Sequence, residues 1–182
     1  MKKYLLIILS VILAVALAFS VFFIVRQKEK SERELANTIS EICRSVDETK
    51  GSLNCLLEGD YLLTQHNQMY VVYGNFNTLY HLFHENRAVY ADACDDFLYV
   101  GSTFLGGGCY GSFYTTGVFE DERISPNEFA YIKELVKLLD EVVMEIDDKP
   151  ANEKLEILNA NLRAVHEQLN SINASPFIQI RG

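Results

Sequence analysis

The sequence predicts a mainly α-helical protein, in which an N-terminal transmembrane helix precedes an elongated up-and-down helical bundle with a glycine-rich loop in the middle. Three observations lead to this prediction. The chain opens with a long uncharged run, apolar residues then recur at helical spacing, and glycines and prolines separate these stretches. We therefore expect an anchor over residues 1–25 and a helical domain over residues 26–182.

The anchor is predicted from residues 4–25, which are 22 residues without a charge between Lys3 and Arg26. About 20 apolar residues, each rising ~1.5 Å, cross a hydrocarbon core of about 30 Å. Small residues near Ala18 also resemble the cleavage site of a secretory signal, which would release a secreted soluble factor. The apolar region of a signal is usually about 7–15 residues long, and this run continues to Val25. We therefore expect residues 4–25 to remain in the lipid bilayer.

The orientation of the anchor is argued from the charges that flank it. Two basic residues precede the run and four follow it, Arg26, Lys28, Lys30 and Arg33, so the positive-inside rule by count favours a cytoplasmic domain. A short basic tip before a long apolar run is also typical of export, and four cysteines, an even number, suit an oxidising compartment. We expect an extracytoplasmic domain, with a cytoplasmic one as the alternative.

The charge of the domain bears on its partners. The formal net charge of the chain is −9, and from Ser31 onward 11 Lys/Arg stand against 24 Asp/Glu. A surface of this sign repels phosphate backbones, so we expect no nucleic-acid binding. The apolar fraction of 49% is enough to form a core, which argues against disorder.

Two helices are predicted in the first half of the domain. One spans residues 26–50 and ends at Gly51, and its apolar stripe can also be traced further, through Leu35, Ile39, Ile42, Val46, Leu53 and Leu56. The other spans residues 53–104, with Gly74 as a candidate kink. Its apolar residues are spaced by seven, as in a coiled coil: Leu62, Met69, Phe76, Phe83, Tyr90, Phe97 and Phe104. Gly74 and Asn75 could alternatively form the turn of a β-hairpin.

Two further helices are predicted in the second half. Glycines at positions 106–108 and 111 interrupt any helix, so residues 105–124 are expected to form a loop with room for a short hairpin. A capping box from Ser125 to Glu128 begins a helix over residues 126–147. Pro150 separates it from a helix over residues 150–173, and the two should fold back on each other. Residues 177–182 remain as a tail.

The four cysteines are Cys43, Cys55, Cys94 and Cys109, and none belongs to a C-x-x-C pair, which argues against zinc ribbons and thioredoxin-like motifs. Pairing of neighbours gives two candidate disulfides, Cys43–Cys55 across a turn and Cys94–Cys109 across the glycine loop. The second closes a loop of about 15 residues and would stabilise the fold by roughly 3 kcal/mol. The alternative is four small, buried, reduced thiols.

Other candidate chemistry has simpler explanations. His81, His84 and Glu85 lie on one predicted helical turn, but a bundle metal site needs a second Glu-x-x-His, so we expect solvated histidines. The acidic groups at residues 92–96 and 120–122 lack the spacing of a calcium loop and are expected to be solvated. The glycine loop is not followed by Lys-Ser/Thr, and no G-x-S-x-G turn occurs. We expect no cofactor, no metal and no enzymatic activity.

Residues 61–114 carry eight tyrosines, which are candidate anchors of a protein interface or the lining of a ligand cleft: Tyr70, Tyr73, Tyr80, Tyr90 and Tyr99 are the main ones. The alternative is packing of large side chains in and beside the core. We therefore expect a membrane-tethered, non-enzymatic helical interaction module whose partner is another protein or a second copy of the chain. An extracytoplasmic ligand-sensing bundle that acts through a partner is the alternative.

Overall fold

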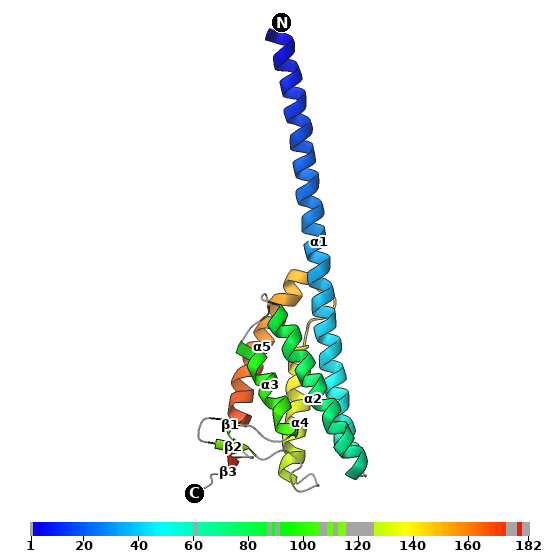
Figure 1. The fold of residues 1–182 in the computed structure, drawn as a ribbon, viewed down its shortest axis with the longest axis vertical. Coiled ribbons are helices and arrows are strands. Elements are labelled where there is room, and N and C mark those ends of the chain that lie inside the picture. Colours follow the sequence, from blue (N-terminus) through cyan, green and yellow to red (C-terminus); the bar gives the residue numbers. More distant parts are fainter. Residues whose placement is uncertain are drawn as a thin grey trace. The chain divides into compact units, whose positions relative to one another are not determined.

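The computed structural model describes residues 2–59, 62–86, 89, 92–105, 109–110, 113–115, 126–173 and 178–179. Within these ranges the chain is mainly helical, as predicted (Figure 1). The helices are α1 (Lys2–Glu58), α2 (Leu62–Glu85), α3 (Asp92–Leu105), α4 (Pro126–Val142) and α5 (Ala151–Asn173). The short strands are β1 (Cys109–Tyr110), β2 (Phe113–Thr115) and β3 (Ile178–Gln179).

The chain divides into two compact units, Met1–Asn37 and Thr38–Gly182. The first unit consists of the N-terminal part of α1, and the second contains the remainder of α1 together with all the other helices and strands. The predicted boundary at residue 25 was drawn where the apolar run ends, whereas the division in the structure follows packing. The core described below belongs to the second unit.

Helix α1 continues through Gly51, where the sequence predicted a break, so the separate helix starting at residue 53 is corrected. Leu53 and Leu56 extend the stripe of Ile39, Ile42 and Val46, and all five side chains are at most 2% exposed. Burying two leucines stabilises by roughly 3–6 kcal/mol, whereas a mid-helix glycine costs about 1 kcal/mol. Burial therefore outweighs the glycine. Ser52, the next residue, donates a hydrogen bond to the Thr49 carbonyl at 2.7 Å within the continuing helix.

The predicted helix over residues 53–104 is in fact two helices, α2 and α3, which fold back on each other. All described members of the seven-residue series are buried: Met69, Phe76, Phe83, Phe97 and Phe104 are at most 4% exposed. Phe83 packs on Phe97 with ring centroids 5.2 Å apart, and Phe76 lies 6.0 Å from Phe104, which makes the helices antiparallel (Figure 1). The stripe therefore predicted the core correctly but missed the reversal.

Asn86 ends α2. Its side-chain amide donates to the Leu82 carbonyl at 2.7 Å, which satisfies one of the carbonyls left open at a helix C-terminus. The backbone then turns, with the Val89 amide donating to the Asn86 carbonyl at 2.9 Å, and Val89 is buried. No glycine or proline marks this turn, so no helix-breaking residue was there to predict it. Helix α2 continues through Gly74, as the preferred helical prediction has it, and the alternative hairpin at Gly74 and Asn75 is not formed.

Helices α4 and α5 form the expected pair. Helix α4 begins at Pro126, as the capping box predicted, but ends at Val142 rather than residue 147. Asn161 of α5 explains the early end, because its amide donates to the carbonyls of Val142 and Met144 at 3.2 and 2.9 Å. The turn that follows includes Glu145 with φ 62°.

The five helical segments of the second unit make contacts that close into a ring. Helix α1 contacts α2 through Ser52 and Asn75, and α2 contacts α3 through Phe76 and Phe97. Helix α3 contacts α5 through Asp96 and His166, and α5 contacts α4 through Asn161 and the Val142 carbonyl. The ring closes where Asp140 of α4 contacts Lys50 of α1. The buried side chains of α1, α2 and α3 and those of α4 and α5 face inward, and together they form the core.

A small antiparallel sheet accompanies the helices. Strands β1 and β2 pair with Tyr110 opposite Phe113. They form the short hairpin that the sequence allowed within residues 105–124. Strand β3 then pairs with β2, with Ile178 opposite Thr115. The sequence predicts only a tail over residues 177–182. A two-residue strand has no alternation of apolar and polar residues, so its distant pairing partner cannot be read from sequence.

Candidate functional site

The most unusual surface of the described chain lies on α1 within residues 12–25. All ten large apolar side chains of this segment are 49–70% exposed: Ile12, Leu13, Val15, Leu17, Phe19, Val21, Phe22, Phe23, Ile24 and Val25. At 100° per residue these positions cover every side of the helix, and a helix that is apolar all round belongs in a protein core or a membrane. Ser20, the one hydroxyl in the segment, bonds the Ala16 carbonyl at 2.9 Å.

Among the residues that the structure describes, no helix is both long enough and apolar enough to cross a membrane. The predicted anchor, residues 4–25, includes residues 5–9 and 11, whose side chains lie outside the described set.

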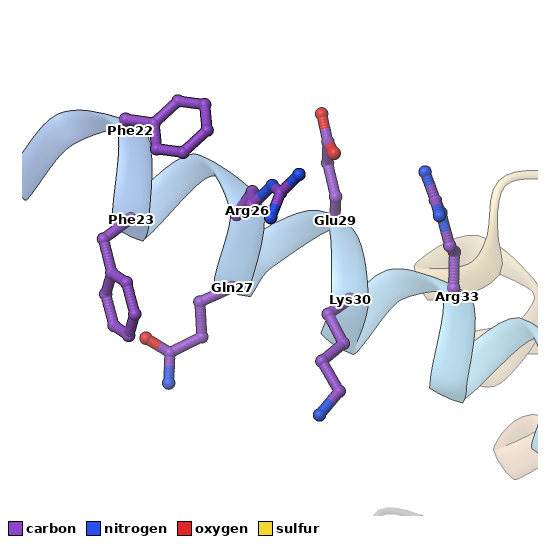
Figure 2. A pocket seen from close by; sticks show the side chains of 7 residues that line it. All are labelled: Phe22, Phe23, Arg26, Gln27, Glu29, Lys30 and Arg33. Carbon is purple, nitrogen blue, oxygen red and sulfur yellow. The ribbon is translucent and has the colours of Figure 1, made fainter. Parts of the chain in front are cut away.

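An open depression lies on α1 at the C-terminal end of this apolar segment, and Figure 2 shows the side chains that line it. They are Phe22, Phe23, Arg26, Gln27, Glu29, Lys30 and Arg33. Arg26, Glu29 and Arg33 project to one side of the helix, and Phe23, Gln27 and Lys30 project to the other (Figure 2). Because α1 supplies every lining residue, the depression has no opposite wall of the kind that encloses a small molecule.

The positive charges beside this depression fall into two classes. Lys28 and Lys30 each approach a glutamate one turn later, Glu32 at 3.8 Å and Glu34 at 3.6 Å. Arg26 lies over the Phe22 ring, 5.4 Å from its centroid.

In the described part of α1, neither Arg26 nor Arg33 forms an ion pair with a carboxylate. The two guanidinium groups therefore differ from the ammonium groups of Lys28 and Lys30, each of which has a carboxylate within 4 Å.

The structure does not bring Cys43 and Cys55 together. Both thiols are free, and both lie on the uninterrupted helix α1, where 12 residues span about 18 Å. A disulfide needs Cα atoms about 4.4–6.8 Å apart, so this pairing is corrected. The half-buried Cys43 thiol has a raised pKa, chiefly because of burial and then because of the Asp147 carboxylate. Cys55 is exposed.

The other candidate disulfide, Cys94–Cys109, falls outside what the structure describes. Cys94 lies on α3 and Cys109 on β1, but neither side chain is among the described ones. This pairing stays a prediction.

The candidate tyrosines do not share one environment. Tyr70 on α2 and Tyr99 on α3 are 55% and 42% exposed, while Tyr73 and Tyr80 are half-buried and Tyr90 lies outside the described residues. Tyr80 stacks on His84 with ring centroids 5.5 Å apart. The interior between α2 and α3 is instead filled by phenylalanines, as the Phe76–Phe97 stacking shows. Tyr70 and Tyr99 are thus the exposed ones among the described candidate tyrosines.

One acidic residue differs from the solvated face that the sequence analysis expected. Asp96 on α3 is only 6% exposed and hydrogen-bonds Nδ1 of His166 on α5, whereas its neighbour Asp95 is exposed. The sequence separates the partners by 70 residues, so no local pattern could have paired them. Within the described ranges, no group of three His, Cys, Asp or Glu side chains could hold a metal ion.

A polar seam between α1 and α2 was also missed. The side chains of Ser45, Thr49 and Ser52 are buried, and Thr49 bonds the Ser45 carbonyl at 2.7 Å. The amide of Asn75 on α2 donates to the Ser52 hydroxyl at 3.2 Å. The sequence signal was available, since residues 45, 49 and 52 share one helical face.

Comparison of the whole chain with protein families, with curated proteins and with solved structures found no match.

Proposed function

We propose that this chain is a membrane-tethered, non-enzymatic helical interaction module, anchored in the lipid bilayer through residues 4–25, with its bundle on the extracytoplasmic side. The observation that carries the proposal is the apolar surface of α1, where ten large side chains are 49–70% exposed. Leaving such a surface in water costs on the order of 10 kcal/mol. A bilayer removes this cost, and the Ser20 hydroxyl would keep a partner in lipid because it donates to the Ala16 carbonyl.

The bundle supports an interaction role more than a sensing role. Phe76 and Phe83 both pack against Phe97 in the space between α2 and α3, whereas a sensor of small ligands needs room there. Large apolar side chains remain exposed on the described surface of the second unit at Tyr70, Val71, Tyr99 and Met144. Aromatic side chains of this kind are common anchors of protein interfaces. The partner is then another protein or a second copy of the chain.

The anchor is tested with charges placed in the apolar run. In the double variant Leu13→Lys/Leu17→Lys, each lysine opposes membrane insertion by about 2.5–3.5 kcal/mol. We expect the unmodified chain to stay in the membrane pellet after alkaline extraction and the variant to move to the supernatant. The matched control, Gln27→Lys/Ser31→Lys, adds the same two charges outside the run and should stay in the pellet.

The pellet and supernatant of the same extraction also test the alternative function, a secreted soluble factor. An unmodified chain that is extracted freely, with an N-terminus near Phe19 by mass spectrometry, would replace the tether with a secreted soluble factor. Orientation is read at Cys55, whose exposed thiol should react with a membrane-impermeant maleimide in intact cells. Labelling only after permeabilisation would place the bundle in the cytoplasm.

The interaction role is tested by photo-crosslinking in intact cells. A photoreactive residue at Tyr70 or Tyr99 should give a discrete protein adduct, because these side chains are exposed and aromatic. The matched controls are Thr78 and Asp95, polar exposed positions on the same two helices. The absence of an adduct at all four positions would count against an interaction module.

A further inference from the structure

We infer that Arg26 and Arg33 bind the headgroup of an anionic phospholipid at the end of the membrane anchor. This inference rests on the proposed function, because it assumes that the preceding apolar segment lies in a bilayer. It goes further by naming the lipid class and the two residues that select it.

The lysines and the arginines of this part of α1 differ in how their charge is compensated. Lys28 and Lys30 each lie within 4 Å of a glutamate, at 3.8 and 3.6 Å, which offsets their positive charge. Arg26 and Arg33 form no such pair in the described part of the helix. A guanidinium group also presents a planar fork that binds phosphate oxygens bidentately, which an ammonium group cannot do.

The positions of the two arginines on α1 also favour binding of a headgroup. They are seven residues apart, two helical turns, and project to the same side of α1 (Figure 2). Cα–Cβ bonds of a helix tilt toward its N-terminus, which on α1 is the direction of the apolar segment. Both side chains therefore start toward the bilayer surface, and Arg26 is held beside the last aromatic turn by the Phe22 ring.

The lining of the depression combines apolar and basic side chains. Phe22 and Phe23 form its apolar end, and Arg26, Lys30 and Arg33 form its basic end. A phospholipid has the same order, with an acyl chain followed by a phosphate. The depression is open along one helix, which suits a lipid that lies beside the anchor better than a soluble anion that needs enclosure.

Glu29 supplies a test of opposite sign. Its carboxylate projects between Arg26 and Arg33 on the same side of the helix and therefore repels an anionic headgroup (Figure 2). If the two arginines bind a phosphate there, Glu29→Gln must strengthen the binding.

The experiment is electron paramagnetic resonance of the full chain in phosphatidylcholine vesicles that contain spin-labelled phosphatidylglycerol or spin-labelled phosphatidylcholine. The motionally restricted fraction of each lipid gives the relative affinity of the protein surface. We expect a preference for phosphatidylglycerol of about three- to ten-fold, lost at about 1 M salt. Arg26→Gln/Arg33→Gln should reduce the preference to near one, while Glu29→Gln should increase it.

The matched control is Lys28→Gln/Arg44→Gln, which removes the same charge from α1 at two residues that do not line the depression and that each lie beside a glutamate, and it should keep most of the preference. Equal losses in the two double variants, or no preference in the unmodified chain, would overturn the inference while leaving the anchor in place. A chain that restricts neither lipid would overturn the anchor itself and this inference with it.

Discussion

Gly101 of α3 lies directly against Phe76 of α2: a Cβ atom at Gly101 would be 2.9 Å from the Cβ atom of Phe76. Real Cβ atoms do not approach so closely, and the Phe76 Cβ is fixed by its own backbone. The next nearest atoms would be Cγ of Phe76, at 3.7 Å, and Cδ2 of Tyr73, at 3.8 Å. Glycine therefore permits the close approach of α2 and α3 on which the stacked phenylalanine core depends.

Gly101→Ala should destabilise the protein. Overpacking a core costs about 1–3 kcal/mol, and the better helix propensity of alanine returns about 1 kcal/mol, so we expect a net loss of about 1 kcal/mol. The measurement is urea unfolding of the full chain in detergent, followed by near-ultraviolet circular dichroism. Gly74→Ala is the matched control on α2, because nothing lies within 4 Å of its Cβ position, and it should stabilise by about 0.5–1 kcal/mol. A Gly101 variant as stable as the Gly74 variant would contradict the packing argument.

His166→Ala should also destabilise the bundle, because it removes a hydrogen-bond partner of the buried Asp96 carboxylate. Loss of a partner by a buried polar group costs about 1–3 kcal/mol. Urea unfolding of the single variants and of Asp96→Ala/His166→Ala completes a double-mutant cycle, in which the losses should be clearly less than additive. His81→Ala and Asp95→Ala, at exposed positions, should leave stability nearly unchanged. Additive losses would mean that the two side chains stabilise the fold independently.

These relationships show which parts of the fold could be predicted from the sequence. The spacing of Met69, Phe76 and Phe83 identified the core, because helical periodicity depends only on which face is buried. The same spacing continues through the turn at Asn86, so it could not reveal that α3 reverses direction. At Gly51 a local breaker signal was overruled by the burial of Leu53 and Leu56, a tertiary effect that no local pattern contains.

The candidate sites likewise divide into features that are visible in the sequence and features that depend on the folded structure. The exposed apolar segment and the basic residues after it are contiguous in sequence and could be found there. The Asp96–His166 contact joins residues 70 positions apart, and the compensation of Lys28 by Glu32 depends on side-chain geometry. Sequence thus located the basic surface that follows the apolar segment, and the structure separated Arg26 and Arg33 from the lysines.

Cys43 should react with iodoacetamide more slowly than Cys55 in the folded chain. The Cys43 thiol is half-buried and its pKa is raised, first by burial and then by Asp147, so less of the reactive thiolate is present at a given pH. We expect a rate difference on the order of ten-fold near pH 8, measured by peptide mass spectrometry. The pH midpoint of the Cys43 reaction should fall when the chain is unfolded in urea.

Two variants check the cause of this difference. Asp147→Asn should speed the reaction of Cys43, since the carboxylate raises the pKa, and Lys154→Met should slow it, since the ammonium group lowers the pKa. The reaction of Cys55 serves as the internal control in both. Equal rates at Cys43 and Cys55 in the folded chain would show that the thiol is not shielded.

Lys50 should give the bundle a stability that disappears at high pH. Its pKa is raised above the ordinary value of 10.5, chiefly by the hydrogen bond to Asp140 on α4 and also by the one to Asp47. Because the folded state holds the proton more tightly than the unfolded state, the contribution is complete below pH 10.5 and is lost as pH rises through the folded pKa.

Lys50→Met should therefore cost about 0.5–1 kcal/mol at neutral pH, a value reduced by solvent because Asp140 is 58% exposed. Urea unfolding at several pH values should show that the difference in free energy of unfolding between the variant and the unmodified chain disappears above the folded pKa. Lys137→Met is the control, since its partners Glu134 and Glu141 lie on the same helix and join no second element. A difference at Lys50 that persists at the highest pH would mean that its alkyl chain, and not its charge, stabilises the contact between α1 and α4.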